Sequence, residues 1–178
     1  MPLPTLVIVS GPVGTGKTTL AHELARLIPC PAICRDEIKE GMVHSVPGFM
    51  PAPGDPLTLR TLGVFFDVLE LLLKAGVSVV AEAAFQDKVW RPRLEPLQSL
   101  AEFRIIHCHA DPAAVRERIA DRAPRAAHAD AAWVEQRERE PEKAAFEPLT
   151  WPSPSLTVDT THGYVPTLDE VVAFVAAH

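Results

Sequence analysis

Apolar residues along the chain form short continuous runs that are separated by longer stretches with helical periodicity. The runs are rich in β-branched residues and cover 5–10, 31–34, 77–83, 103–109 and 156–159. A continuous apolar run of this length is typical of a strand that is buried on both faces of a parallel sheet. We therefore predict five strands.

The stretches between these runs carry apolar residues at positions three and four apart, which predicts helices. They cover 18–27, 36–42, 57–75, 88–100, a helix opened by Asp111 and Pro112, 131–140 and 167–177. Segment 45–56 holds four prolines and two glycines, which predicts a surface loop. Strands that alternate with helices predict an α/β fold with a parallel sheet and right-handed crossovers.

Size and composition favour one domain over residues 1–178. The chain is 47% hydrophobic and 22% charged, which is globular composition. The first residues, MPLPTLVIVSG, lack a basic region, and their apolar run is too short for a signal peptide or a membrane span, so we expect a soluble cytoplasmic protein. The three cysteines lack the spacing of a disulfide framework or of a zinc site.

The net charge of -6 argues against a protein that coats nucleic acid, because such binding requires many Lys and Arg residues. A local basic patch is compatible with this charge. Four arginines, Arg116, Arg118, Arg122 and Arg125, fall within ten residues. Either they bind an anion or they are the solvated charges of a helix.

The glycine-rich stretch after the first strand carries the strongest chemical signal. GPVGTGKT matches the phosphate-binding pattern G-x-x-x-x-G-K-[ST] between a predicted strand and a predicted helix. Its glycines allow backbone N–H groups to point at phosphate oxygens, the lysine reaches the β and γ oxygens, and the threonine can ligate Mg²⁺. We predict binding of ATP and Mg²⁺ by Gly11, Pro12, Val13, Gly14, Thr15, Gly16, Lys17, Thr18 and Thr19.

Beyond this loop the sequence resembles the P-loop kinases of the group that contains 5'-hydroxyl polynucleotide kinase, chloramphenicol phosphotransferase and the zeta-toxin sugar kinases. Many ATP-binding proteins labelled AAA belong to the same group. The matching stretches are GPVGTGKTT, RDEIKEGM, EAAF, VRERIADR and VDTTH. The resemblance implies a P-loop NTPase fold, a three-layer sandwich with sheet order 2-3-1-4-5 and a small helical lid at about 122–131.

The resemblance also implies roles for residues that follow the second strand. Asp36 matches the aspartate that takes the proton from the acceptor hydroxyl, although a helix cap is an alternative role for it. Arg35 and Lys39 flank Asp36 and are candidates to hold the acceptor. Lys39 stands where polynucleotide kinases have an arginine, which weakens the case for that substrate. Arg91 is a further candidate substrate contact.

Three more residues receive roles from the same resemblance. Glu82, after the third strand, matches an acidic residue that orients the magnesium shell; pairing with Arg91 is the alternative. Arg118 matches an arginine that stacks on adenine. Arg122 matches one that reaches the phosphates, where charge develops during transfer. Backbone of the VDTTH stretch is expected near the adenine.

Three functions remain open at this point. The first is an ATP- and Mg²⁺-dependent kinase for a hydroxyl of a small molecule, with Asp36 as general base and Lys17 and Arg122 assisting. The second is a 5'-hydroxyl polynucleotide kinase. The third is a nucleotide-controlled switch without an acceptor, which would need no base beside the phosphates.

Overall fold

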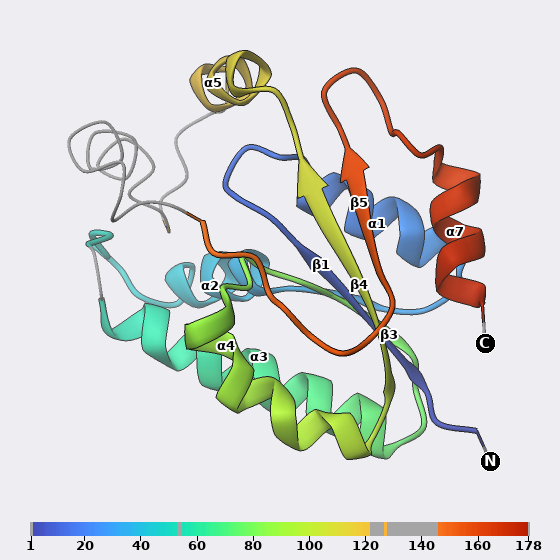
Figure 1. Cartoon of the computed structure of the whole chain (residues 1–178). Helices are drawn as coiled ribbons and strands as arrows, with labels where there is room; N and C mark the ends of the chain where they lie inside the picture. The colour runs from blue at the N-terminus through green and yellow to red at the C-terminus, as the bar shows by residue number, and fades with distance from the viewer. Residues whose placement is uncertain (1, 53–54, 122–126, 128–145, 178) are drawn as a thin grey trace.

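The strands of this protein form one parallel sheet. The computed structural model describes residues 2–52, 55–121, 127 and 146–177. Its five-stranded sheet has the order β2-β3-β1-β4-β5, with every neighbouring pair parallel (Figure 1). The strands are β1 (Thr5–Ser10), β2 (Ala32–Cys34), β3 (Val79–Glu82), β4 (Glu102–His109) and β5 (Ser155–Asp159). The expected P-loop sheet order is confirmed.

Helices fill the connections between the strands. They are α1 (Lys17–Leu27), α2 (Arg35–Val43), α3 (Pro56–Lys74), α4 (Asp87–Leu94), the short 3₁₀ helix η1 (Glu95–Ser99), α5 (Pro112–Ala120) and α7 (Leu168–Ala176). Local signals set several of their ends. The Asp111 side chain accepts a hydrogen bond from the backbone N–H of Ala113 at 2.7 Å, which caps α5 as expected.

The sheet is covered on both faces, and the alternation of side chains along β1 explains why. Leu6 and Ile8 belong to a buried cluster with residues of α3, α4 and η1. Val7 and Val9, which point to the opposite face, belong to a second cluster with residues of α1 and α7. Both faces are therefore apolar, and the result is a three-layer arrangement (Figure 1).

One helix prediction was wrong in its extent. The expected helix 88–100 is divided into α4 and η1, with the break at Leu94 and Glu95. Pro96 has no N–H to donate to the carbonyl four residues earlier, which interrupts the α-helical hydrogen bonds even though Glu95 keeps helical dihedral angles. The other described elements begin and end within two residues of their predicted positions. The predicted helix 131–140 and nearly all of the predicted lid lie outside the described residues.

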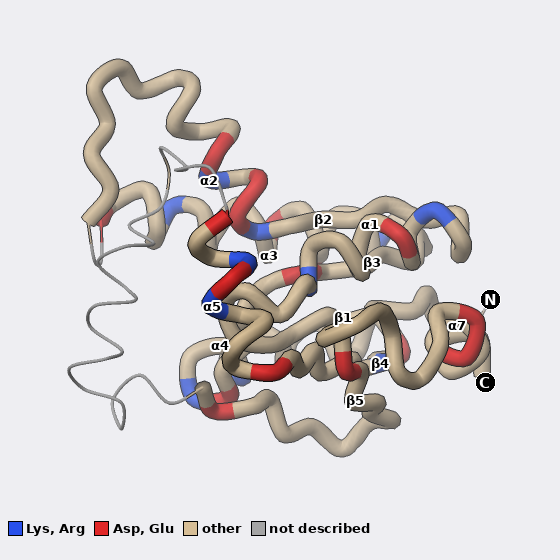
Figure 2. The backbone as a smooth tube through the Cα atoms, turned by 90° about the horizontal axis from the view of Figure 1, so that it is seen from above, with Lys and Arg blue, Asp and Glu red and all other residues tan. Residues whose placement is uncertain are grey.

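The carboxyl ends of the strands meet at one edge of the sheet, where ligands of open α/β sheets bind. The phosphate loop follows β1, α2 follows β2, and α5 follows β4 at this edge. Figure 2 shows acidic and basic residues along both α2 and α5. Among the described helices, none is long and apolar enough to cross a membrane.

Candidate active site

The loop between β1 and α1 is folded tightly at the end of the central strand. Gly14 has a φ of 80°, which L residues rarely adopt, and an added Cβ there would lie 2.8 Å from a methyl carbon of Val115. A Cβ on Gly11 would lie 2.5 Å from the carbonyl oxygen of Cys108. The loop conformation therefore requires the glycines that the motif supplies.

Side chains within the loop hold this conformation. The Thr15 hydroxyl donates to the carbonyl of Pro12 at 2.8 Å, and the Lys17 ammonium donates to the same carbonyl at 3.1 Å. The first turn of α1 begins at Lys17, so its unpaired backbone N–H groups and the positive end of its dipole face the loop. This arrangement fits an anionic phosphate group.

A buried carboxylate stands beside the start of α1. Glu82, at the end of β3, is only 3% exposed. It accepts a hydrogen bond from the Thr18 hydroxyl at 3.2 Å and lies 3.8 Å from the Lys17 ammonium. Its partners are therefore residues of the phosphate loop, and Arg91, the alternative partner considered from the sequence, bonds to Asp87 instead.

The carboxylate of Glu82 is in surroundings that oppose its ionisation unless a cation lies nearby. Burial raises the pKa of Glu82, and the negative charges of Asp36 and Glu37 raise it further, against the opposing effects of Lys17 and Thr18. A divalent cation next to this carboxylate would stabilise its ionised form. The pair of oxygen donors on Thr18 and Glu82 fits the preference of Mg²⁺ for a few protein oxygens.

A cavity beside the phosphate loop is also lined by Asp36, which lies in the first turn of α2. The cavity has a volume of about 480 Å³. It is lined by Val13, Gly14, Gly16, Lys17, Thr18, Thr19, Asp36, Arg118, Ile119, Thr160, Gly163 and Tyr164. The side chain of Asp36 is 40% exposed. Its carboxylate accepts a hydrogen bond from the guanidinium of Arg35 at 3.0 Å. The predicted base and the predicted phosphate loop thus share one cavity.

Arg118 joins α5 to the phosphate loop and to the segment after β5. Its guanidinium donates to the carbonyls of Thr160 and Thr161, at 2.5 and 3.1 Å, and approaches the carbonyl of Gly14 at 3.4 Å. The Thr160 hydroxyl in turn donates to the carbonyl of Thr15 at 2.9 Å. Arg118 therefore lines the cavity in a fixed position, while its predicted stacking on adenine stays a prediction.

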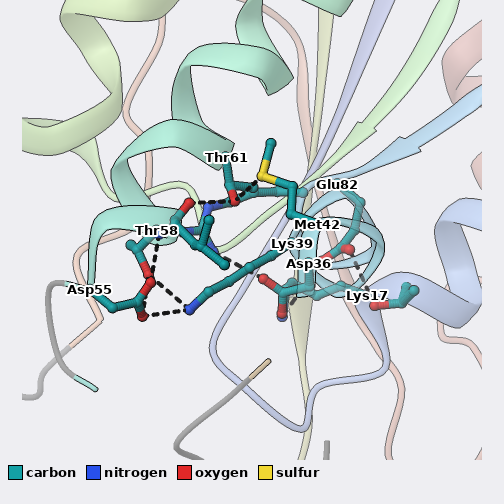
Figure 3. Close-up of polar contacts among 11 residues, drawn as sticks. Lys17, Asp36, Lys39, Met42, Asp55, Thr58, Thr61 and Glu82 are labelled. Carbon is teal, nitrogen blue, oxygen red and sulfur yellow. Dashed lines mark hydrogen bonds and ion pairs between the residues drawn. The ribbon is translucent and has the colours of Figure 1, made fainter. Parts of the chain in front are cut away.

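Two predicted substrate residues have partners within the protein. Lys39 is 5% exposed and donates to Asp55 at 2.8 Å and to the Thr58 hydroxyl at 2.9 Å. Figure 3 shows Lys39 directed toward Asp55 and Thr58, with Lys17 and Glu82 on the opposite side. The structure therefore places Lys39 in a junction between α2 and α3 and does not bring it to the cavity.

Arg91 is also engaged elsewhere. It forms two hydrogen bonds with Asp87, at 2.7 and 3.0 Å, one with the carbonyl of Thr150, and lies over the ring of Trp151 at 5.1 Å. It does not line the cavity. Arg122, the predicted phosphate contact from the lid, lies outside the described residues.

Sequence reasoning did not single out Ile119, Gly163 or Tyr164, which line the cavity. Tyr164 is the only tyrosine of the chain, and a single residue gives no spacing to interpret. Thr160 belongs to the VDTTH stretch, for which only backbone near the nucleotide was expected. Its hydroxyl ties that stretch to the phosphate loop at the carbonyl of Thr15, with the carbonyl of His109 on β4 also within reach.

A protein-family model described as AAA domain matches residues 6–149, the stretch that contains the loop, Asp36, Glu82 and Arg118. The chain belongs to this family. The expectation of a P-loop kinase with a nucleotide-binding fold is thereby confirmed. No curated protein matches the sequence.

Solved structures of kinases share the fold of this AAA domain protein. A candidate kinase from Chloroflexus aurantiacus is 25% identical, with 97% of each chain covered and a TM-score of 0.81. A sugar kinase from Janibacter is 18% identical, with 99% of this chain and 100% of that chain covered and a TM-score of 0.65. The APS kinase of Mycobacterium tuberculosis, solved with AMPPNP and APS, is 16% identical. The match covers 99% of this chain and 100% of that chain, with a TM-score of 0.65. The last two identities establish likeness of fold alone.

Proposed function

We propose that this protein is an ATP- and Mg²⁺-dependent kinase that transfers the γ-phosphoryl group of ATP to a hydroxyl of a small molecule. The observation that carries the proposal is the shared cavity, which contains Lys17 and Thr18 of the phosphate loop and Asp36 of α2. A nucleotide switch needs no carboxylate at this place. A kinase needs one within reach of its acceptor.

The phosphate loop binds and orients the donor in this proposal. Backbone N–H groups from Gly14 to Thr18 hold the phosphates, and Lys17 balances their charge. Thr18 and Glu82 would hold Mg²⁺, directly or through its waters, and the bound ion would neutralise charge on the transferring group. Arg118 closes the cavity on the side of α5 and adds positive charge.

Asp36 acts as the general base of the reaction. Its carboxylate accepts the proton of the acceptor hydroxyl as the oxygen forms its bond to the γ-phosphorus and the bond to the β-phosphate oxygen breaks. The products are a phosphate ester, ADP and the proton, which passes from Asp36 to solvent. Arg35 holds Asp36 through its hydrogen bond at 3.0 Å and thereby orients the carboxylate.

A screen of hydroxyl-bearing metabolites and antibiotics for ADP release tests this function. We expect at least one compound to give ADP together with its own phosphate ester, and Asp36→Asn to remove this transfer. Asp67→Asn is a matched control, because Asp67 is exposed on α3. An oligonucleotide with a free 5'-hydroxyl belongs in the same screen: labelling of this compound alone, weakened steeply by salt, would contradict a small-molecule acceptor.

A further inference from the structure

A second group of metal-ligating side chains lies where α1, β2 and α2 meet. His22 comes from α1, Cys34 ends β2 and Glu37 belongs to the first turn of α2. The His22 Nε2 atom lies 2.7 Å from a carboxylate oxygen of Glu37 and 3.7 Å from the Cys34 sulfur. All three donor atoms lie within 4.8 Å of one another. They face one point from three separate elements.

These separations are close to those of a tetrahedral zinc site. With bonds of about 2.3 Å to sulfur and about 2.0 Å to nitrogen or oxygen, tetrahedral angles place donor atoms roughly 3.3 to 3.6 Å apart. The nitrogen to sulfur distance of 3.7 Å is within about 0.1 Å of this range. The nitrogen to oxygen distance would increase by about 0.6 Å as a shared hydrogen bond is replaced by two bonds to the metal.

We propose that His22, Cys34 and Glu37 bind one Zn²⁺ ion, with water as the fourth ligand. The identity of the metal follows from the donors, since imidazole and thiolate select Zn²⁺ over Mg²⁺, which prefers oxygen ligands. The donor set thus differs from the Thr18 and Glu82 oxygens of the active site, although Cys34 lies beside Glu82 in the sheet. Cysteine spacing could not indicate it, because only one of its ligands is a cysteine.

The surroundings of Cys34 favour a cation. Cys34 is 2% exposed, and its Cα pairs in register with Glu82 of β3. The carboxylate of Glu37 lies in the same cluster. When Zn²⁺ binds, it replaces the proton of the Cys34 thiol, which is released to solvent as the zinc to sulfur bond forms.

The ion can enter from solvent. The His22 and Glu37 side chains are 38% and 48% exposed, while Cys34 forms the closed end of the site. His22 lies four residues after Thr18 on α1, so the two side chains are one helical turn apart on the same face. Zinc at this site would link α1 to α2, the helix that carries Asp36.

Binding of Co²⁺, a spectroscopic substitute for Zn²⁺, tests the proposal on the whole chain in excess Mg²⁺. We expect one Co²⁺ per chain with a thiolate charge-transfer band, which Zn²⁺ displaces and Mg²⁺ does not. Cys34→Ser should abolish the band and lower Zn²⁺ affinity by at least roughly 100-fold, since loss of a partner outside the ligand shell already costs about 10–100-fold. Cys30→Ser is the matched control and should retain the band, because Cys30 is not part of the cluster.

Two further variants, Glu37→Gln and His22→Asn, should fold normally because both side chains are partly exposed. They therefore test metal binding even if Cys34→Ser fails to fold. Each should weaken Zn²⁺ binding by about tenfold or more in a calorimetric titration. The absence of a thiolate band in the wild-type protein would overturn the proposal. Equal Zn²⁺ affinity in the wild type and in Cys34→Ser would overturn it as well.

Discussion

The proposed donor side and the proposed acceptor side of the cavity are built in different ways. On the donor side, the phosphate loop and the start of α1 are consecutive in the chain, and short-range bonds such as Thr15 to Pro12 hold them. On the acceptor side, Asp36 and Arg35 lie on α2, whose position depends on Lys39 and its partner Asp55, sixteen residues later. A local sequence motif therefore specifies the donor side, whereas a tertiary contact supports the acceptor side.

The two sides should therefore respond differently to substitution. Changes in the loop should affect nucleotide binding directly. Changes at the junction of α2 and α3 should act on stability and on the acceptor, and should leave the nucleotide affinity of the folded protein nearly unchanged.

Lys39→Ala should give the largest loss of stability. It leaves the carboxylate of Asp55, which is 7% exposed, without its ammonium partner. Breaking one half of a buried ion pair costs about 3–5 kcal/mol. Chemical denaturation should show this decrease in the free energy of unfolding. Lys74→Ala is the control, because its pair with Glu70 is exposed and contributes about 0.5 kcal/mol or less.

Arg118→Ala should act on the donor side with a smaller effect. It removes the hydrogen bonds that join α5 to Thr160 and Thr161, together with a positive charge in the cavity. We expect ATP affinity to fall about tenfold, as the loss of a charged hydrogen-bonding group typically costs roughly 1.5 kcal/mol. Arg116→Ala, on the exposed face of the same helix, should bind ATP normally. Equal affinities in both variants would remove Arg118 from the nucleotide site.

The pH dependence of stability should report the Lys39 and Asp55 junction. Burial opposes ionisation of Asp55, but hydrogen bonds from Lys39 and Thr58 outweigh it and hold the pKa of Asp55 below its usual value. A lowered pKa in the fold contributes stability that is present above the unfolded-state pKa of about 3.9 and is lost as pH falls below it. The stability difference between wild type and Asp55→Asn should therefore shrink in acid. A difference independent of pH would contradict this role.

The contrast between the two sides also explains what the sequence could predict. The strands follow from local patterns and the phosphate loop from a motif with a fixed geometry, whereas the sheet order was implied by the resemblance to P-loop kinases. The pairing of Lys39 with Asp55 spans a proline-rich loop, and no spacing rule joins two such residues. Arg91 likewise contacts Thr150 and Trp151, which are distant in sequence. The prediction for Lys88 to Leu100 failed for a local reason, because the effect of Pro96 on the helix was underestimated.

The role of Asp36 is tested most directly by measuring ATP affinity and phosphoryl transfer in the same variant, Asp36→Asn, with an acceptor found in the screen. Asparagine keeps the size of the side chain but does not accept the hydroxyl proton. We expect ATP affinity within about threefold of the wild type and transfer slower by on the order of 10²–10⁴. Transfer at the wild-type rate would contradict the assignment of Asp36 as the general base.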